Sequence, residues 1–433
     1  MRKLLGFGAL ALVMVTAPAC GKGKGKDKDK DKGAAKGAVG EQGGEKGSAL
    51  ATDKGVDAAN KVVRIGLLND ESGPAAIIGK PYAKGKRLLA KRVNAGGSGL
   101  LPDGWTIELI EKDHQYNPQQ SVQHYNAIKS DVLFIGHSFG TPNTLPLRDM
   151  LERDNIVAFP ASLSSEMAKH IYTPPLGPDY RVEAMRAMDW VVEQAGGADK
   201  VKAAIVYQKD DYGKDGLEGW KAAAEHYGVK IVSEQTVAPG QKDVTAVVAA
   251  LKESGANYVM LTVLPSGTGP IVGTAAQLQY GPTWLGNTPS WIDGFFNPEV
   301  IPSAVFGNFH MVTGFSYWGE DVPGMSEFLA LWESHKDEYG PQDWYILGSY
   351  VQGLVELQAL HRAIESGDAT RAGFLSALQG IDNWNAGGMV QPVSLSAFPY
   401  LVSTRTRVLK PDFANKTWTE VGVFAEPASL KAQ

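Results

Sequence analysis

The chain has 433 residues, of which 43% are hydrophobic and 21% charged; this length allows two or three domains, and the composition excludes an intrinsically disordered protein. Residues 61–433 carry 31 Lys and Arg against 40 Asp and Glu, and this acidic excess argues against nucleic acid as a partner. The single cysteine, Cys20, excludes an intrachain disulfide and a multi-cysteine zinc site.

The first twenty residues have the pattern of a secretory signal. Arg2 and Lys3 precede an apolar run, Leu4–Val15, which is shorter than the roughly 20 residues that a membrane span needs. The sequence Ala-Pro-Ala before Cys20 resembles a bacterial lipobox, after which the cysteine is lipidated and becomes the mature N-terminus. We therefore expect a signal peptide over 1–20 and an extracytoplasmic lipoprotein anchored through Cys20. The alternative is a plain secretory signal with an incidental cysteine.

Residues 21–60 are predicted to be a disordered tether. The stretch Gly21–Gly33 alternates Gly, Lys and Asp without an apolar residue, so it cannot bury enough surface to order itself. Its spaced aspartates do not form a calcium loop, because Lys32 and Ala38 stand where Gly and Glu are needed. We expect no metal site and no cofactor.

From residue 62 onward, short apolar runs alternate with helical periods. The predicted strands are Val62–Leu68, Trp105–Ile110, Val132–Ile135, Val201–Tyr207, Val229–Glu234 and Tyr258–Val263. The predicted helices are Gly79–Asn94, Gln119–Ile128, Gly213–Tyr227, Val244–Ser254 and Gly267–Gln279. This alternation predicts an α/β fold with two doubly wound parallel sheets. Ligands of such sheets bind beyond the carboxyl ends of the strands, where five polar loops stand: Asn69–Gly73, Gly136–Thr141, Pro160–Ser165, Lys209–Gly213 and Gly286–Ser290.

A series of short motifs in a fixed order resembles the leucine/isoleucine/valine-type periplasmic binding proteins of ABC transporters. The motifs are Ile65-Gly66-Leu67, Ser72-Gly73-Pro74-Ala75, Val93-Asn94-Ala95-Gly96-Gly97, Asn117-Pro118, Ile135-Gly136-His137, Phe159-Pro160-Ala161-Ser162, Asp211-Tyr212-Gly213 and Pro392-Val393-Ser394. The resemblance runs over 62–425 and implies a type I bilobal fold in which three crossovers form the hinge. It implies one lobe of 61–181 plus 314–400 and a second of 182–313 plus 401–433.

The resemblance also implies that the protein is not an enzyme. It implies capture of a small amino acid, or a related amide or carboxylate, between the lobes and delivery to an ABC permease. A ligand sensor, or a lipoprotein that activates cell-wall synthases, is the alternative on the same fold. Uptake and sensing, inner and outer membrane anchoring, and the oligomeric state stay open.

An enzyme alternative rests on Gly136-His137-Ser138-Phe139-Gly140, which has the nucleophile-elbow spacing of α/β-hydrolases. His310, His335 and His361 follow Ser138 in the order that a triad needs. Pro142 and Pro146 interrupt the helix that should support the serine, which argues against this reading.

The resemblance carries ligand-contacting roles onto individual positions. They are Thr141 or Gly140 for the carboxylate, main-chain groups of Ala161, the position of Leu163 with Ser162 or Ser164 as its hydroxyl substitute, and Tyr212 and Leu264 from the second lobe. Thr288 stands where the family has a carboxylate for the ligand's ammonium. Because a buried ammonium needs an anionic partner, either Asp211 or another acid supplies it, or the ligand is not an α-amino acid. One or two aromatics of the group between Trp284 and Trp318 are candidates for an apolar part of the cleft.

Overall fold

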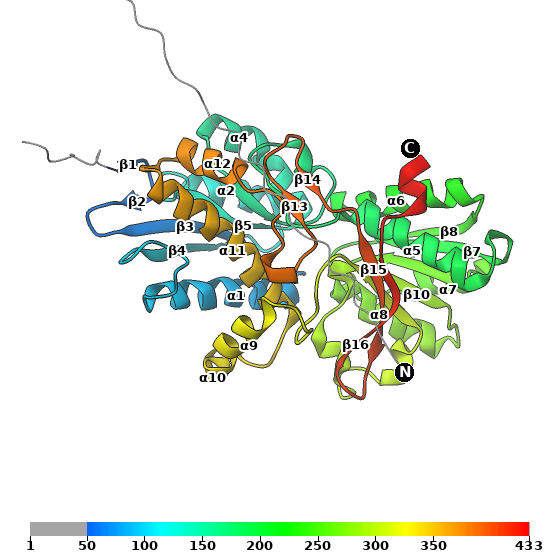
Figure 1. The fold of residues 1–433 in the computed structure, drawn as a ribbon. Coiled ribbons are helices and arrows are strands. Elements are labelled where there is room, and N and C mark those ends of the chain that lie inside the picture. Colours follow the sequence, from blue (N-terminus) through cyan, green and yellow to red (C-terminus); the bar gives the residue numbers. More distant parts are fainter. Residues whose placement is uncertain (1–49, 433) are drawn as a thin grey trace, which may run out of the picture. The chain divides into compact units, whose positions relative to one another are not determined.

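Two large β-sheets organise the described residues, 50–432, of the computed structural model (Figure 1). The first sheet contains β2 (Val56–Asp57), β3 (Val62–Asn69), β4 (Thr106–Asp113), β5 (Phe134–Phe139) and β6 (Ala158–Ala161). β3 lies between β4 and β5, β6 follows β5, and all four are parallel. β2 pairs antiparallel with the start of β3.

The second sheet is larger and mixed. Its strands are β7 (Lys202–Gln208), β8 (Lys230–Val237), β9 (Tyr258–Thr262), β10 (Thr283–Asn287), β11 (Phe309–Thr313), β15 (Thr406–Asp412) and β16 (Thr417–Ala425). The order is β8-β7-β9-β10-β11-β15-β16, with the first five parallel and the last two antiparallel. The predicted α/β fold with two parallel sheets is confirmed, and β15 and β16 extend the second sheet.

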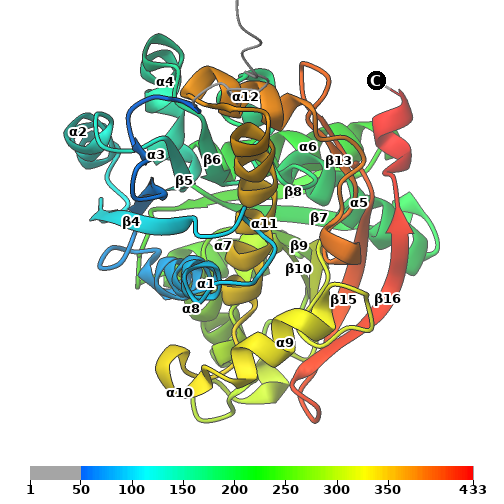
Figure 2. The same cartoon turned by 60° about the vertical axis from the view of Figure 1, so that its left-hand side comes forward.

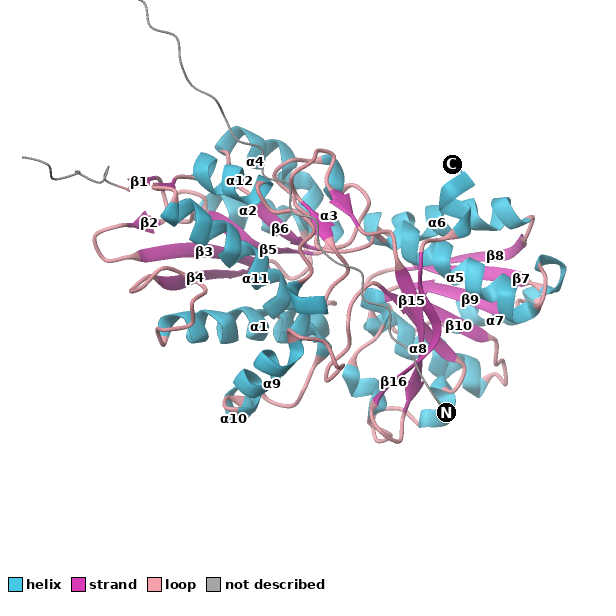
Figure 3. Ribbon diagram, viewed as in Figure 1, coloured by secondary structure: helices cyan, strands magenta, loops and turns pink. Residues whose placement is uncertain are grey.

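Helices cover both faces of each sheet (Figure 3). On the first sheet, α1 (Ala76–Asn94), α11 (Trp344–Glu365) and α12 (Arg371–Gln379) share one apolar core, while α2 (Pro118–Ile128) and α4 (Arg148–Asp154) lie over another. On the second sheet, α5 (Tyr180–Ala195) and α6 (Asp211–Tyr227) oppose α7 (Thr245–Ser254) and α8 (Pro265–Gln277). The remaining helices are α3 (Thr141–Thr144), α9 (Met325–Glu333) and α10 (Lys336–Tyr339).

α1 and α11 pack against each other beside the first sheet (Figure 2). Their contact contains a buried ion pair in which Lys86 Nζ lies 2.7 Å from Glu356 Oε1. A Cβ atom on Gly85 would lie 2.2 Å from the carbonyl oxygen of Ile346, so only glycine permits this approach of the two backbones. This packing fixes the position of α11, whose first turns reach the space between the two sheets.

Three crossovers connect the two lobes and lie side by side. They pass through Pro178, Gly314 and Arg405, which precede α5, follow β11 and precede β15. A Cβ on Gly314 would lie 2.4 Å from Pro178 Cγ and 3.5 Å from the Arg405 carbonyl oxygen. This close approach brings segments more than 200 positions apart in the chain to one place.

The tether prediction ends too late along the chain. Residues 50–60 belong to the described fold: β1 (Ala51–Thr52) pairs parallel with β12 (Asp368–Ala369), and β2 pairs with β3. Strands of two residues leave no alternating pattern in the sequence, which explains why β1 and β2 were not predicted. Likewise, β14 (Leu401–Val402) pairs with β13 (Val393–Ser394) of the first lobe, so the third crossover follows residue 402 rather than 400. The signal peptide and most of the tether lie outside the described residues.

Candidate ligand-binding site

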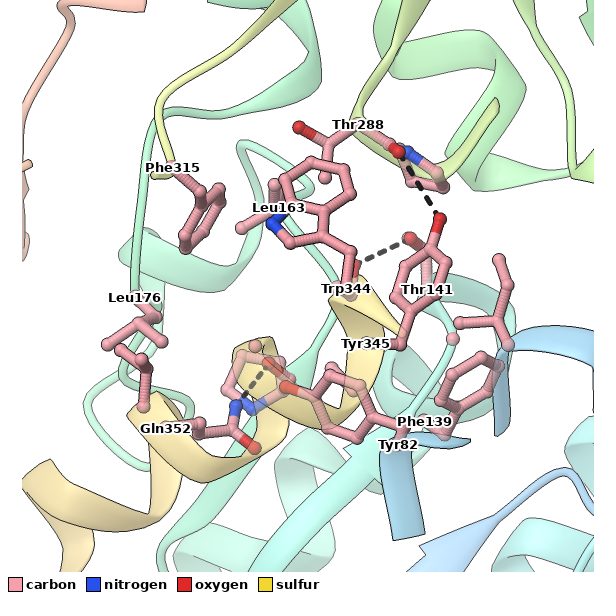
Figure 4. A pocket seen from close by; sticks show the side chains of 18 of the residues that line it. Tyr82, Phe139, Thr141, Leu163, Leu176, Thr288, Phe315, Trp344, Tyr345 and Gln352 are labelled. Carbon is pink, nitrogen blue, oxygen red and sulfur yellow. Dashed lines mark hydrogen bonds between the residues drawn. The ribbon is translucent and has the colours of Figure 1, made fainter. Parts of the chain in front are cut away.

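A cavity of about 110 Å³ lies between the two sheets. It is lined by residues at the carboxyl ends of β5, β6 and β10, by the loop after β9 and by the first turn of α6. α1, α11 and residues near the crossovers supply most of the rest of its wall (Figure 4). Parallel sheets place their ligand sites at these strand ends, so the topology creates the cavity from segments distant in sequence.

Eight of the nine predicted contact positions line this cavity. They are Gly140, Thr141, Ala161, Ser162, Leu163, Tyr212, Leu264 and Thr288. Ser164 does not line it; its hydroxyl instead accepts a hydrogen bond from the Glu166 amide at 3.4 Å. That these residues contact the ligand is a prediction.

The strand ends of the first lobe place two hydroxyls together. Gly140 has φ +87°, and a Cβ there would lie 2.8 Å from both Tyr116 and Asn143, so the position requires glycine and offers no hydroxyl. The next residue, Thr141, brings its Oγ1 to 2.7 Å from Ser162 Oγ. Ser162 Oγ also accepts the amide of Ser164 at 3.2 Å. This geometry favours Thr141 over Gly140 as the side-chain donor.

Tyr212 anchors the second-lobe side of the cavity. Its hydroxyl donates to Asn287 Oδ1 at 2.7 Å, and the Asn287 amide donates to Thr262 Oγ1 at 3.1 Å. Burial raises the pKa of Tyr212 well above its usual range. Because its hydroxyl is used inside the lobe, Tyr212 offers the cavity its ring, which packs edge-on against Tyr180 with centroids 4.8 Å apart.

Much of the aromatic wall was not predicted from the sequence. Tyr82 from α1, Trp344 and Tyr345 from α11, and Tyr180 at the start of α5 all line the cavity. Phe315 is the member of the predicted aromatic group that does so. The four residues from α1, α5 and α11 lie in segments without a site motif, and their only sequence signal is the density of aromatic residues.

Direct contacts hold the lobes together around the cavity. Tyr116 of the first lobe donates to Asp210 at 3.4 Å and accepts from Gln208 at 3.3 Å. The backbone amide of Ser165 donates to Asp215 of α6 at 3.0 Å, and the Ser165 hydroxyl donates to the same carboxylate. Burial raises the pKa of Asp215 to about 7. Because residues of both lobes line the cavity and the lobes contact each other beside it, the cavity has the geometry of a closed cleft.

Within the described part of the chain, none of the side chains lining the cavity is acidic or basic. Asp211, one predicted partner for an ammonium, lies outside the lining and pairs with Lys214 at 3.5 Å. The acid nearest to Thr288 is Glu183 of α5, which is fully buried and accepts the Thr288 amide at 3.0 Å together with the Thr288 hydroxyl. Burial raises the pKa of Glu183 well above its usual range.

Ser138 does not form a nucleophile elbow. It lies inside β5, fully buried, and its Oγ is 2.8 Å from Thr144 Oγ1. His137 beside it is also fully buried, and desolvation holds its pKa well below the usual value. The described residues contain no cluster of three or more His, Cys, Asp or Glu suited to a metal ion. Over residues 50–432, no helix is both long and apolar enough to cross a membrane.

Comparisons with known proteins agree with this architecture. The sequence model of a family described as periplasmic binding protein matches residues 62–397. The chain is 24% identical over 351 residues to Leu/Ile/Val-binding protein homolog 7 of Brucella abortus, covering 77% of this chain and 85% of that protein. It is 27% identical over 217 residues to an amino acid binding protein of Pseudomonas aeruginosa, covering 48% of this chain and 56% of that protein.

Two solved structures share the fold. A fatty acid ABC transporter substrate-binding protein from Thermomonospora curvata superposes with a TM-score of 0.81 at 23% identity, covering 89% of this chain and 97% of that one. A branched chain amino acid ABC transporter protein from Thermus thermophilus, with bound valine, gives 0.74 at 19% identity, covering 86% and 98%. The predicted resemblance is confirmed: the chain belongs to the periplasmic binding protein family, with the type I fold and relatives of the Leu/Ile/Val-binding group.

Proposed function

We propose that this protein is an extracytoplasmic solute-binding lipoprotein, which captures a small and largely apolar solute between its lobes and delivers it to an ABC permease. The observation that carries the proposal is the uncharged cavity closed by both lobes at their strand ends. Enclosure on this scale suits binding and release of an intact solute, because ligand sites are concave, mostly apolar and furnished with a few polar groups.

Closure of the lobes is the proposed working step. The crossovers at Pro178, Gly314 and Arg405 stand at one place and are the expected hinge. A solute that contacts both walls favours the closed form, since it gains those contacts only there. Pairs such as Ser165 with Asp215 then hold the lobes together, and the closed form presents one continuous surface to a permease.

The membrane anchor is a separate part of the proposal. Cys20 follows the signal-like segment and precedes the described fold by 30 positions, and several acyl chains on one cysteine anchor a protein stably. Radiolabelled palmitate should enter the full-length chain in a bacterial host, and Cys20→Ser should abolish the labelling. Labelling that persists in Cys20→Ser would contradict this anchor.

The binding function is tested by thermal unfolding of residues 48–433, which form one compact unit. The screen uses amino acids, short carboxylic acids and amides. A bound solute at 100 times its Kd should add about 2.7 kcal/mol to the free energy of unfolding. Ala161→Leu fills the cavity wall and should remove the response, whereas Ala127→Leu, on the exposed side of α2, is the matched control. A panel without any response would refute the proposed function.

A further inference from the structure

We infer that the solute is an amine-free carboxylic acid with a compact apolar body. This inference rests on the proposed function and names the ligand class for the same cavity. Two observations carry it: the acid nearest to Thr288 is sealed away from the cavity, and the polar side chains that line the cavity are uncharged and include hydroxyls that can donate a hydrogen bond.

The sealed carboxylate belongs to Glu183. Both of its oxygens are occupied by Thr288, which donates its backbone amide to Oε2 at 3.0 Å and its hydroxyl to Oε1. Glu183 is fully buried and does not line the cavity, whereas Thr288 does. In Figure 4 the Thr288 hydroxyl points away from Tyr345 and Thr141. Thr288 therefore separates the acid from any ligand.

The acids of α6 at the cleft are also engaged elsewhere. Asp210 caps α6 by accepting the Gly213 amide at 3.1 Å, and Asp215 accepts both donors of Ser165. Asp211 pairs with Lys214 at the surface. None of the three lines the cavity. An ammonium enclosed there would lose its water without gaining an anionic partner among the described residues, which disfavours every α-amino acid.

The hydroxyl groups that line the cavity suit an acceptor on the ligand, and Gln352 Oε1, a buried acceptor without a hydrogen-bond partner among the described residues, lines the cavity beside them. Ser162 Oγ accepts the Ser164 amide, shares one hydrogen with Thr141 and hydrogen-bonds Tyr180, so one hydroxyl hydrogen among these three cavity residues is left to donate into the cavity. Tyr82 also lines the cavity, and its hydroxyl has no hydrogen-bond partner in the part of the chain that the structure describes. Hydroxyls that donate to a carboxylate make short, charge-assisted hydrogen bonds.

The apolar part of the wall determines the size and polarity of the ligand body that fits. Leu176, Leu264, Leu347 and Met389 line the cavity together with the aromatic residues. Its volume is about 110 Å³, and an engineered apolar cavity of about 150 Å³ takes benzene. An acid with a branched chain or a single ring therefore fits better than a long, extended chain.

Isothermal titration of residues 48–433 tests the inference with three matched pairs that differ only by the amine. The pairs are 4-methylpentanoate and L-leucine, hexanoate and L-norleucine, and 3-phenylpropanoate and L-phenylalanine. At least one acid should bind at one site per chain, at least 100-fold more tightly than its amino acid. Ser162→Ala and Tyr82→Phe should each weaken that acid about tenfold, and Tyr172→Phe, whose hydroxyl reaches Asn155 outside the cavity, should not.

Equal or tighter binding of the amino acids would overturn the inference and leave the proposed function intact. Failure of all three acids would also overturn it, and the wider thermal panel then decides the proposed function separately. Binding of an acid that neither Ser162→Ala nor Tyr82→Phe weakens would refute the assignment of the head-group donors.

Discussion

We expect Asp215 to make the proposed closure of the lobes sensitive to pH. Its side chain is 6% exposed in the closed cleft, and burial, followed by the charge of Asp179, raises its pKa from 3.8 to about 7. Ser165 and Arg181 act in the opposite direction. In an opened cleft Asp215 regains water and its ordinary pKa. The closed form thus binds the proton more tightly, so closure is favoured as pH falls through 7 and loses this advantage as pH rises from about 4 to 7.

The size of the effect follows from the two pKa values. With 3.8 for the open form and about 7 for the closed form, linkage gives a rise in ligand affinity of about tenfold between pH 8 and pH 6. A carboxylic acid probe stays ionised over this range, so its own titration does not contribute. The assay is isothermal titration of 4-methylpentanoate at pH 6, 7 and 8, with the wild-type chain and with Asp215→Asn.

Asp215→Asn is the decisive comparison, because asparagine keeps the shape and still accepts the Ser165 amide but carries no charge. We expect its affinity to be flat between pH 6 and 8 and higher than the wild-type value at pH 6, because closure of the wild type at that pH must still take up a proton whereas asparagine is neutral in both forms. An affinity that rises with pH, or a pH dependence that survives unchanged in Asp215→Asn, would show that another group governs closure.

Three further outcomes follow from contacts elsewhere in the fold. Lys86→Met should lower the free energy of unfolding by about 3–5 kcal/mol in urea titrations, because it leaves the Glu356 carboxylate buried and unpaired. The double variant Lys86→Met with Glu356→Leu should recover most of this lost stability, and a double variant as unstable as the single one would contradict the reasoning. Gly314→Ala should lower the melting temperature and slow ligand binding in stopped-flow mixing, because its Cβ would overlap Pro178. If both values are unchanged, Gly314 is not part of the hinge. Tyr212→Phe should cost about 1 kcal/mol in urea unfolding through loss of its buried hydrogen bond, while a variant of unchanged stability would show that bond to be unimportant.

The alternation of strands and helices between residues 62 and 279 was predictable because its signals are local. Apolar runs mark the buried strands, and α6 ends at Gly228 in the left-handed conformation that glycine favours. By contrast, α11 was not predicted. Most of its first half is buried on every side, so a polar stripe from which a helical period can be recognised appears only in its second half, at Gln358, Arg362 and Glu365. The antiparallel β15 and β16 were missed as well: they form a hairpin with each other, but β15 joins the sheet only through β11, where Val408 lies opposite Val312.

The candidate site divides in the same way. Strand-end positions such as Thr141 and Tyr212 were accessible through the ordered motifs around them. Tyr82 and Trp344 were not, because they reach the cavity only through the packing of α1 against α11. The role of Glu183 was also hidden: it stands 105 positions from Thr288, and only the fold shows that threonine covers the acid.

The measurement that tests the account most directly is isothermal titration of the tightest-binding matched acid into the wild-type chain and into Ala161→Leu. The account requires one site per chain in the wild type, loss of binding in Ala161→Leu, and full binding in the Ala127→Leu control. Equal affinity in Ala161→Leu would place the solute outside the interlobe cavity and contradict the central claim.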